Sequence, residues 1–159
     1  MNYYDQHVHS SFSFDSQTEL SDYLKHADGC FVTTEHVDLE NSANHFMDSW
    51  MDYDRYSLYL ENLQKNTDIR LLKGVEIGWL RKHHGRLMAW LQCKQFDIIL
   101  LSIHQNGIFD YMDEEAKKHD IIYILRSYFQ QMLDALRSGI NILPPICIYQ
   151  STTISYTGC

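Results

Sequence analysis

The sequence contains little of what makes a chain irregular: only 2 prolines and 7 glycines occur among its 159 residues. Linkers rich in glycine, serine or proline are absent, and a hydrophobic content of 45% is too high for a disordered chain. No apolar run approaches the ~20 residues that span a bilayer, and the N-terminal region lacks the basic and apolar segments of a secretory signal. We therefore expect one cytoplasmic domain without membrane contact.

Positive charge is scarce as well: 13 Lys and Arg against 21 Asp and Glu give a net charge of −8 with histidine neutral. Nucleic-acid binding needs clustered cations, so we do not expect nucleic acid as a partner. The four cysteines form no CxxC pair, which excludes zinc-ribbon and thioredoxin-type motifs. No GxxxxGK or GxGxxG spacing occurs, so no nucleotide cofactor is expected.

Apolar strand-like runs alternate with amphipathic helical windows, which is typical of the βαβ units of an α/β protein. The expected strands cover residues 2–8, 30–34, 69–77 and 97–103. The expected helices cover residues 20–29, 53–63, 86–95 and 121–136. Ser16 and Glu19 predict a capping box before the first helix. Between the second strand and the second helix, the polar segment 35–51 is predicted to be an irregular connection, and such long connections often carry function.

The last twenty residues contain no charged side chain but both prolines, Pro144 and Pro145. Since 21% of all residues are charged, a charge-free stretch of this length has a probability of 0.79 to the twentieth power, or roughly 1 in 100. Two interpretations remain open: a buried strand followed by a polar tail, or a truncated or frame-shifted end with unrelated sequence after about Asn141. We therefore divide the chain into a domain, 1–139, and an atypical tail, 140–159.

His7 and His9 lie at the end of the first expected strand. A spacing of two places both imidazoles on one face of a strand, where they can chelate one metal ion. Taken alone this is a weak motif, because two histidines at an exposed strand end are common without a metal.

The other expected strands also end in residues that bind metals. Glu35 and His36 follow the second strand, Glu76 ends the third and His104 follows the fourth. In a β/α barrel the carboxyl ends of parallel strands meet at one mouth, so these side chains would lie together. Imidazole and carboxylate suit Zn, Mn or Fe ions, and a carboxylate such as Glu76 can bridge two ions. The sequence therefore predicts a metal centre.

Four segments resemble the successive motifs of the PHP (polymerase and histidinol phosphatase) superfamily, in particular its histidinol-phosphatase branch. They are 5–16 (DQHVHSSFSFDS), 33–38 (TTEHVD), 74–76 (GVE) and 102–104 (SIH). The resemblance covers roughly residues 1–139 and implies a distorted (β/α)7 TIM-like barrel. A closed eight-unit barrel needs roughly 250 residues, so we expect this chain to hold the N-terminal portion, about four to five βα units.

The resemblance also implies a chemistry: two to three divalent ions, Zn, Mn or Fe, that promote hydrolysis of L-histidinol phosphate to L-histidinol and phosphate in histidine biosynthesis. His7 and His9 would hold one ion, Glu76 would bridge ions, and His104 would hold the second. Metal-bound water would be the nucleophile, so no catalytic side chain is assigned.

Asp15 and His36 would belong to a third metal site, although Asp15 could instead favour the N-terminus of the first helix. The family's later histidine and its Asp-x-His motif are not visible after Gly139, which favours a truncated chain. Two alternatives therefore stay open: an inactive fragment, whose open sheet edges would promote a homo-oligomer, and an enzyme for another small phosphoester.

Other histidines and cations have a simpler interpretation. The basic run 81–86 (RKHHGR) could meet a substrate phosphate at the barrel mouth, but a solvated loop is the expected state. His26, His45 and His119 are expected to be ordinary surface or packing residues.

Overall fold

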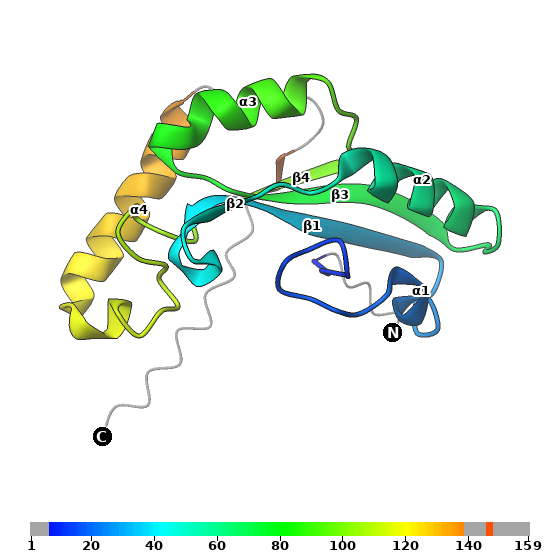
Figure 1. The fold of residues 1–159 in the computed structure, drawn as a ribbon, viewed down its shortest axis with the longest axis horizontal. Helices are drawn as coiled ribbons and strands as arrows, with labels where there is room; N and C mark the ends of the chain where they lie inside the picture. Colours follow the sequence, from blue (N-terminus) through cyan, green and yellow to red (C-terminus); the bar gives the residue numbers. More distant parts are fainter. Residues whose placement is uncertain (1–6, 139–145, 148–159) are drawn as a thin grey trace.

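The computed structural model describes residues 7–138 and 146–147, which form a five-stranded sheet flanked by helices (Figure 1). The strands are β1 (Cys30–Asn41), β2 (Met47–Ser49), β3 (Arg70–Gly78), β4 (Ile98–Ser102) and β5 (Ile146–Cys147). Their order is β2-β1-β3-β4-β5; β2 runs antiparallel to β1, and the other pairs are parallel. The predicted α/β class is confirmed, because helices connect successive parallel strands.

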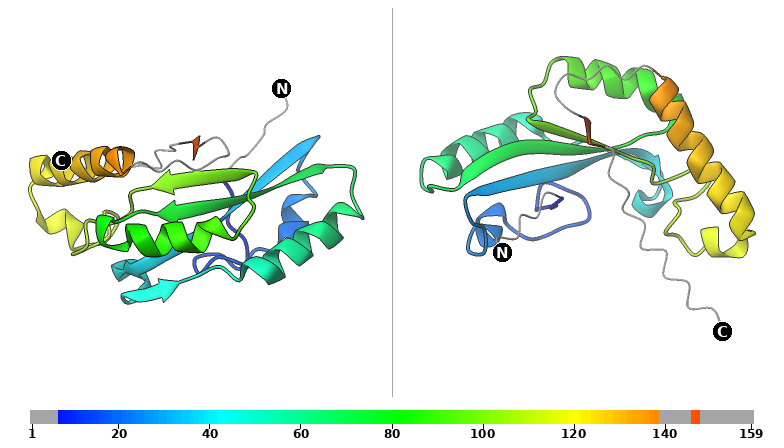
Figure 2. Two further views of the ribbon diagram at one scale, coloured as in Figure 1. Left: turned by 90° about the horizontal axis from the view of Figure 1, so that it is seen from above. Right: turned by 180° about the vertical axis from the view of Figure 1, so that it is seen from behind.

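The main helices flank this sheet. They are α1 (Leu20–Tyr23), α2 (Tyr53–Gln64), α3 (His84–Gln92) and α4 (Ile121–Arg137). Short 3-10 turns are η1 (Ser42–Asn44), η2 (Arg81–His83) and η3 (Ala116–Lys118). Helices α2 and α3 cover one face, α4 lies beside the sheet, and α1 lies past β1, where Phe12 of the preceding segment contacts Tyr56 and Tyr59 of α2 (Figures 1 and 2). None of the helices in the described ranges combines the length and apolar character needed to cross a membrane.

Local signals explain why the later helices form where they do. Asp52 caps α2 by accepting a hydrogen bond from the Arg55 N–H, and Asp120 caps α4 in the same way. Helix α4 ends before Gly139, as the sequence predicts. The first helix differs, since α1 is a single turn and its capping box does not form. The Ser16 hydroxyl accepts a hydrogen bond from the Thr18 N–H instead, within a local turn.

The prediction of an irregular segment over residues 35–51 was wrong. Strand β1 continues to Asn41, and the segment also contains η1 and β2. Glu35, His36 and Asp38 are polar, yet all three are buried in β1. Polar residues in a row are typical of a loop, but in the fold these three side chains contact polar side chains of other segments.

Two parts of the predicted organisation fall at the edges of the described residues. Residues 2–6 of the first expected strand lie outside them, and His7 and Val8 are not in a strand. Within the tail 140–159, residues 146–147 form β5 beside β4, and the remaining tail residues lie outside the described part.

The sheet is held by apolar side chains on the α2 and α3 face and aligned by its register. Tyr56 of α2 is fully buried, and its hydroxyl lies 3.3 Å from the Thr33 carbonyl oxygen and 3.0 Å from that of Gly74, on the adjacent strands β1 and β3. The register pairs His36 with Glu76. It also aligns Asp38 of β1 with Gly78 at the end of β3. Polar residues of neighbouring strands therefore meet near the carboxyl ends of β1 and β3.

Candidate metal centre

The sheet face opposite α2 and α3 carries the predicted ligands. Because side chains alternate along a strand, His36 and Asp38 of β1 share this face, and the parallel register places Glu76 of β3 beside His36. His104 follows β4 by two residues, and its ring contacts the same carboxylate. The convergence predicted from the strand ends is therefore present for His36, Glu76 and His104, whereas Glu35 lies on the opposite face of β1 and does not take part.

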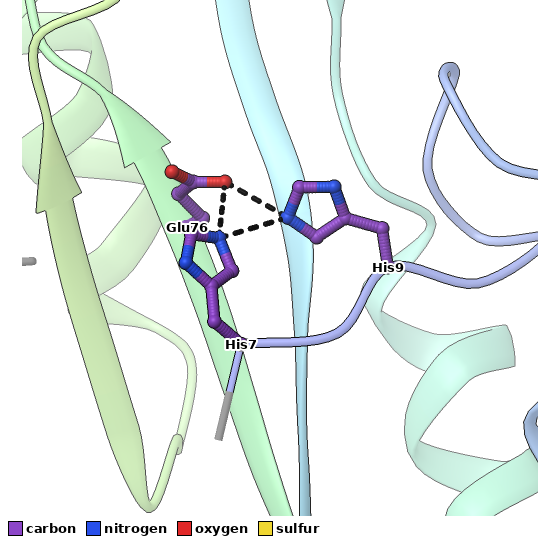
Figure 3. Close-up of side chains that lie close together, drawn as sticks. All are labelled: His7, His9 and Glu76. Atoms are coloured by element: carbon purple, nitrogen blue, oxygen red, sulfur yellow. Dashed lines mark hydrogen bonds and ion pairs between the residues drawn. The ribbon is translucent and has the colours of Figure 1, made fainter. Parts of the chain in front are cut away.

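The segment before α1 brings His7 and His9 to this face. The Thr34 N–H donates to the Val8 carbonyl at 2.9 Å, and the Val8 N–H donates to the Thr34 hydroxyl at 3.1 Å. Val8 is buried, so the histidines on either side of it point the other way, toward Glu76 (Figure 3). Both Nε2 atoms lie 2.9 Å from Glu76 Oε2 and 3.0 Å from each other.

Two further groups of ligand-type atoms adjoin this triangle. His9 Nδ1 lies 3.0 Å and His36 Nε2 lies 3.4 Å from the same Asp15 oxygen. Glu76 lies between His36 and His104, with contacts of 3.3 and 3.1 Å to their Nε2 atoms. The three groups are His7, His9 and Glu76; His9, Asp15 and His36; and His36, Glu76 and His104. Since neighbouring groups share residues, they form one continuous cluster.

The arrangement fits divalent cations. The donors are imidazole nitrogens and carboxylate oxygens, and within each group the ligand atoms lie within 4.8 Å of one another. Two nitrogens and one oxygen about 3 Å apart are spaced as ligands at about 2.1 Å from a common zinc ion would be. Beside the cluster, Asp38 Oδ1 is buried and has no hydrogen-bond partner among the described residues. A cation bound nearby would compensate this unpaired carboxylate oxygen.

The electrostatics keep the carboxylates ionised. Burial by itself raises the pKa of Glu76, but hydrogen bonds from His104, His7 and His9 hold it well below its usual range. The pKa of Asp15 is likewise held low, because contacts with His36 and His9 outweigh its burial. Burial lowers the pKa of His104, yet the nearby Asp38 and Glu76 carboxylates raise it well above its ordinary value. Both acidic members of the three groups are thus anionic near neutral pH.

Several supporting residues were not predicted as part of the site. Asp38 Oδ2 lies 2.8 Å from His104 Nδ1, and the Ser102 hydroxyl donates to Glu76 Oε1 at 2.6 Å. Gly78 leaves room for this contact, since a Cβ there would lie 1.7 Å from Asp38 Oδ1 and 2.8 Å from His104 Nδ1. The available signal was spacing: Asp38 follows His36 by two residues, and therefore shares its face.

Other sequence candidates lie outside the three groups. Arg81, Lys82 and Arg86 form surface ion pairs with Asp134, Glu40 and Asp48, respectively. The basic run is therefore already paired with carboxylates. His26, His45 and His119 are in none of the groups. Asp15 contacts His9 and His36, and α1 has no side-chain cap.

The fold and the three ligand groups are those of an α/β protein with a candidate metal centre. Residues 5–149 match the PHP domain, which is most of the chain, and the chain therefore belongs to the PHP domain family. No curated protein matches it.

A solved structure supports the partial-barrel prediction. The chain is similar to histidinol phosphate phosphatase from Lactococcus lactis subsp. lactis Il1403, crystallised with zinc, L-histidinol and phosphate. The TM-score is 0.76 at 23% sequence identity, and the match covers 86% of this chain and 54% of that one. The chain thus has the fold of part of a PHP TIM-like protein and spans about half the length of this neighbour.

Proposed function

We propose that the chain is a metal-dependent phosphomonoester hydrolase. The observation that carries the proposal is the continuous cluster of ligand-type side chains on one face of the sheet. Its members are His7, His9, Asp15, His36, Glu76 and His104. Membership in the PHP domain family and the fold of the zinc-bound neighbour support the same chemistry.

Each ligand group is a candidate position for one of two to three divalent ions, Zn, Mn or Fe. Glu76 belongs to two groups and offers a different oxygen to His104 than to His7 and His9, which suits a bridging carboxylate. When bound, such ions supply Lewis acidity for transfer of a phosphoryl group to water.

The chain's own residues orient these ligands. Asp38 accepts a hydrogen bond from His104 Nδ1, which orients the ring so that Nε2 would be available to an ion held beside Glu76. Ser102 donates to Glu76 and fixes the rotation of its carboxylate. Glu76 and His104 are therefore held by hydrogen bonds to strand residues, as a preorganised site requires.

Charge explains why phosphate recognition would depend on cations. The net charge of −8 repels a phosphate monoester, and the cluster itself contains Asp15 and Glu76, with Asp38 beside it. Lys82 and Arg86, the nearby side-chain cations after β3, already pair with Glu40 and Asp48. Attraction of the anion therefore falls to ions bound in the cluster.

L-histidinol phosphate is the proposed substrate, with a role in histidine biosynthesis. Two observations support it: the motifs resemble the histidinol-phosphatase branch, and the neighbour structure contains L-histidinol and phosphate. Hydrolysis of another small phosphoester is the alternative. Self-association of the chain stays a prediction, which sedimentation velocity would test.

Phosphate release from L-histidinol phosphate, with added Mn²⁺ or Zn²⁺, tests the proposal. We expect release by the wild-type chain and its loss in His9→Ala. His26→Ala is the matched control, because His26 is exposed and outside the ligand groups. A second phosphomonoester, phosphoserine, measured in parallel separates a specific from a general phosphatase. If folded, metal-loaded protein released no phosphate from either compound, the chain would be a metal-binding PHP domain without hydrolase activity.

A further inference from the structure

Glu35 is a fully buried carboxylate on the opposite face of β1 from His36. Its Oε1 accepts hydrogen bonds from the hydroxyls of Ser10 at 2.7 Å and Thr33 at 2.5 Å. Its Oε2 accepts from the Ser10 N–H at 2.9 Å and the Ser13 hydroxyl at 2.5 Å. In the described part of the chain, no cation lies within ion-pair distance of it. Because a buried charge is costly unless it is well hydrogen-bonded, these donors must stay in place.

Three of the four donors belong to the turn that links two candidate ligands. Ser10 directly follows His9, Ser13 precedes Asp15 by two residues, and the Ser13 N–H closes the turn on the Ser10 carbonyl at 2.8 Å. The Ser13 hydroxyl also accepts the backbone N–H of His36 at 2.9 Å. A single carboxylate therefore ties the turn to the strand that carries His36.

We propose that Glu35 is a positioning residue for the ion site formed by His9, Asp15 and His36, an inference that rests on the proposed metal-dependent function. The Asp15 side chain is 37% exposed, so packing does little to fix it. Its place between His9 and His36 depends on the path of the backbone through residues 10–13. Glu35 sets that path from the far side of β1.

The other ligands have separate supports. Glu76 is on β3 and accepts from Ser102, and His104 is held by Asp38. Neither Ser102 nor Asp38 contacts Glu35. Breaking the hydrogen bonds between Glu35 and the turn should therefore impair one ion site and spare the site of Glu76 and His104, whereas a general structural role would affect all sites or none.

A matched pair of variants tests this selectivity. Ser13→Ala and Thr33→Val each remove one buried hydroxyl that lies 2.5 Å from Glu35. Ser13 belongs to the turn, and Thr33 belongs to β1. In calorimetric titration of metal-free protein with Zn²⁺, we expect Ser13→Ala to weaken one ion roughly 10- to 100-fold. Thr33→Val should leave every zinc affinity unchanged.

A third variant identifies the weakened ion. Asp15→Asn removes a ligand from the group with His9 and His36 alone. If Ser13→Ala acts through this group, it should cause no further loss of zinc affinity in the Asp15→Asn background. Glu35→Gln should show the same selective loss of zinc affinity, and Glu61→Gln, at an exposed glutamate, is its control. If Glu35→Gln does not fold, the comparison of Ser13→Ala with Thr33→Val still tests the proposal.

The outcomes separate the two proposals. Equal effects of Ser13→Ala and Thr33→Val on zinc affinity, or additive losses of Ser13→Ala and Asp15→Asn, would overturn the proposed role of Glu35. They would leave the proposed metal-dependent function unaffected. A wild-type chain that is folded and binds no zinc would overturn the proposed function together with this inference.

Discussion

Raising the pH should destabilise the metal-free protein through His9. Burial by itself lowers the pKa of His9, but its hydrogen bonds to Asp15 and Glu76 outweigh burial and raise the pKa from 6.5 to about 9. A group whose pKa is higher in the folded state binds its proton more tightly there, so protonation favours folding. This contribution is complete below 6.5, the unfolded value, and is lost as the pH rises through about 9.

The size of the effect follows from the same two values. At about 1.4 kcal/mol for each pKa unit, the difference between 6.5 and about 9 corresponds to roughly 3 kcal/mol of unfolding free energy. The His9 side chain is only 19% exposed, so solvent screening reduces this little. Because a domain is stabilised by about 5–15 kcal/mol in total, the loss is large enough to measure.

Urea denaturation of chelator-treated protein, followed by tryptophan fluorescence, measures this free energy. Trp79 is fully buried and reports unfolding. We expect the wild type to lose stability between pH 6.5 and about pH 9, and His9→Gln to lose much less. Saturating zinc should reverse the sign, since ligand histidines must be deprotonated to bind metal. A wild type and a His9→Gln variant with the same pH dependence would refute the reasoning.

Two further predictions concern the support of His104. Gly78→Ala should lower the melting temperature and weaken zinc binding, because the added Cβ would lie 1.7 Å from Asp38 Oδ1 and 2.8 Å from His104 Nδ1. Thermal unfolding with and without zinc measures both effects. An unchanged melting temperature and unchanged zinc binding would contradict the geometry. Asp38→Ala should lower the affinity for one zinc ion roughly 10- to 100-fold, because His104 loses the acceptor at 2.8 Å. Competition with a chelator measures this affinity. A wild-type affinity would contradict a role for Asp38.

The sequence predicted those strands and helices in which the spacing of apolar residues matches the side of the element that is buried. Strands β3 and β4 are apolar runs between turn residues, and α2 and α4 carry apolar residues at helical spacing, so each was expected within a few residues of its observed place. The second half of β1 was missed because Glu35, His36 and Asp38 are polar and buried at once. Whether a polar residue can be buried depends on partners from distant segments, which a local pattern does not contain.

The candidate site was likewise predicted in part: its ligand-type residues were predicted, and the residues that support them were not. The motifs named the six ligand-type residues, and the structure brings all of them into three adjoining groups. The motifs did not identify Asp38 or Ser102 as supports, because their contacts follow from the strand register. Asp38 meets His104 only because it aligns with Gly78, and Gly78 aligns with Ser102 on β4. Register is a property of paired strands and is not encoded in one segment.

Strand β1 carries both a candidate ligand and a residue that supports other candidate ligands. Its period of two places His36 toward the ligand cluster and Glu35 toward the turn that carries His9 and Asp15. If the turn moved, Glu35 would be left in the interior with unpaired oxygens, at a cost of about 1–3 kcal/mol or more for a charged group. This cost falls on any displaced position of the turn and not on the observed one. A partly exposed candidate ligand such as Asp15 would therefore owe its fixed position to a carboxylate that it never touches.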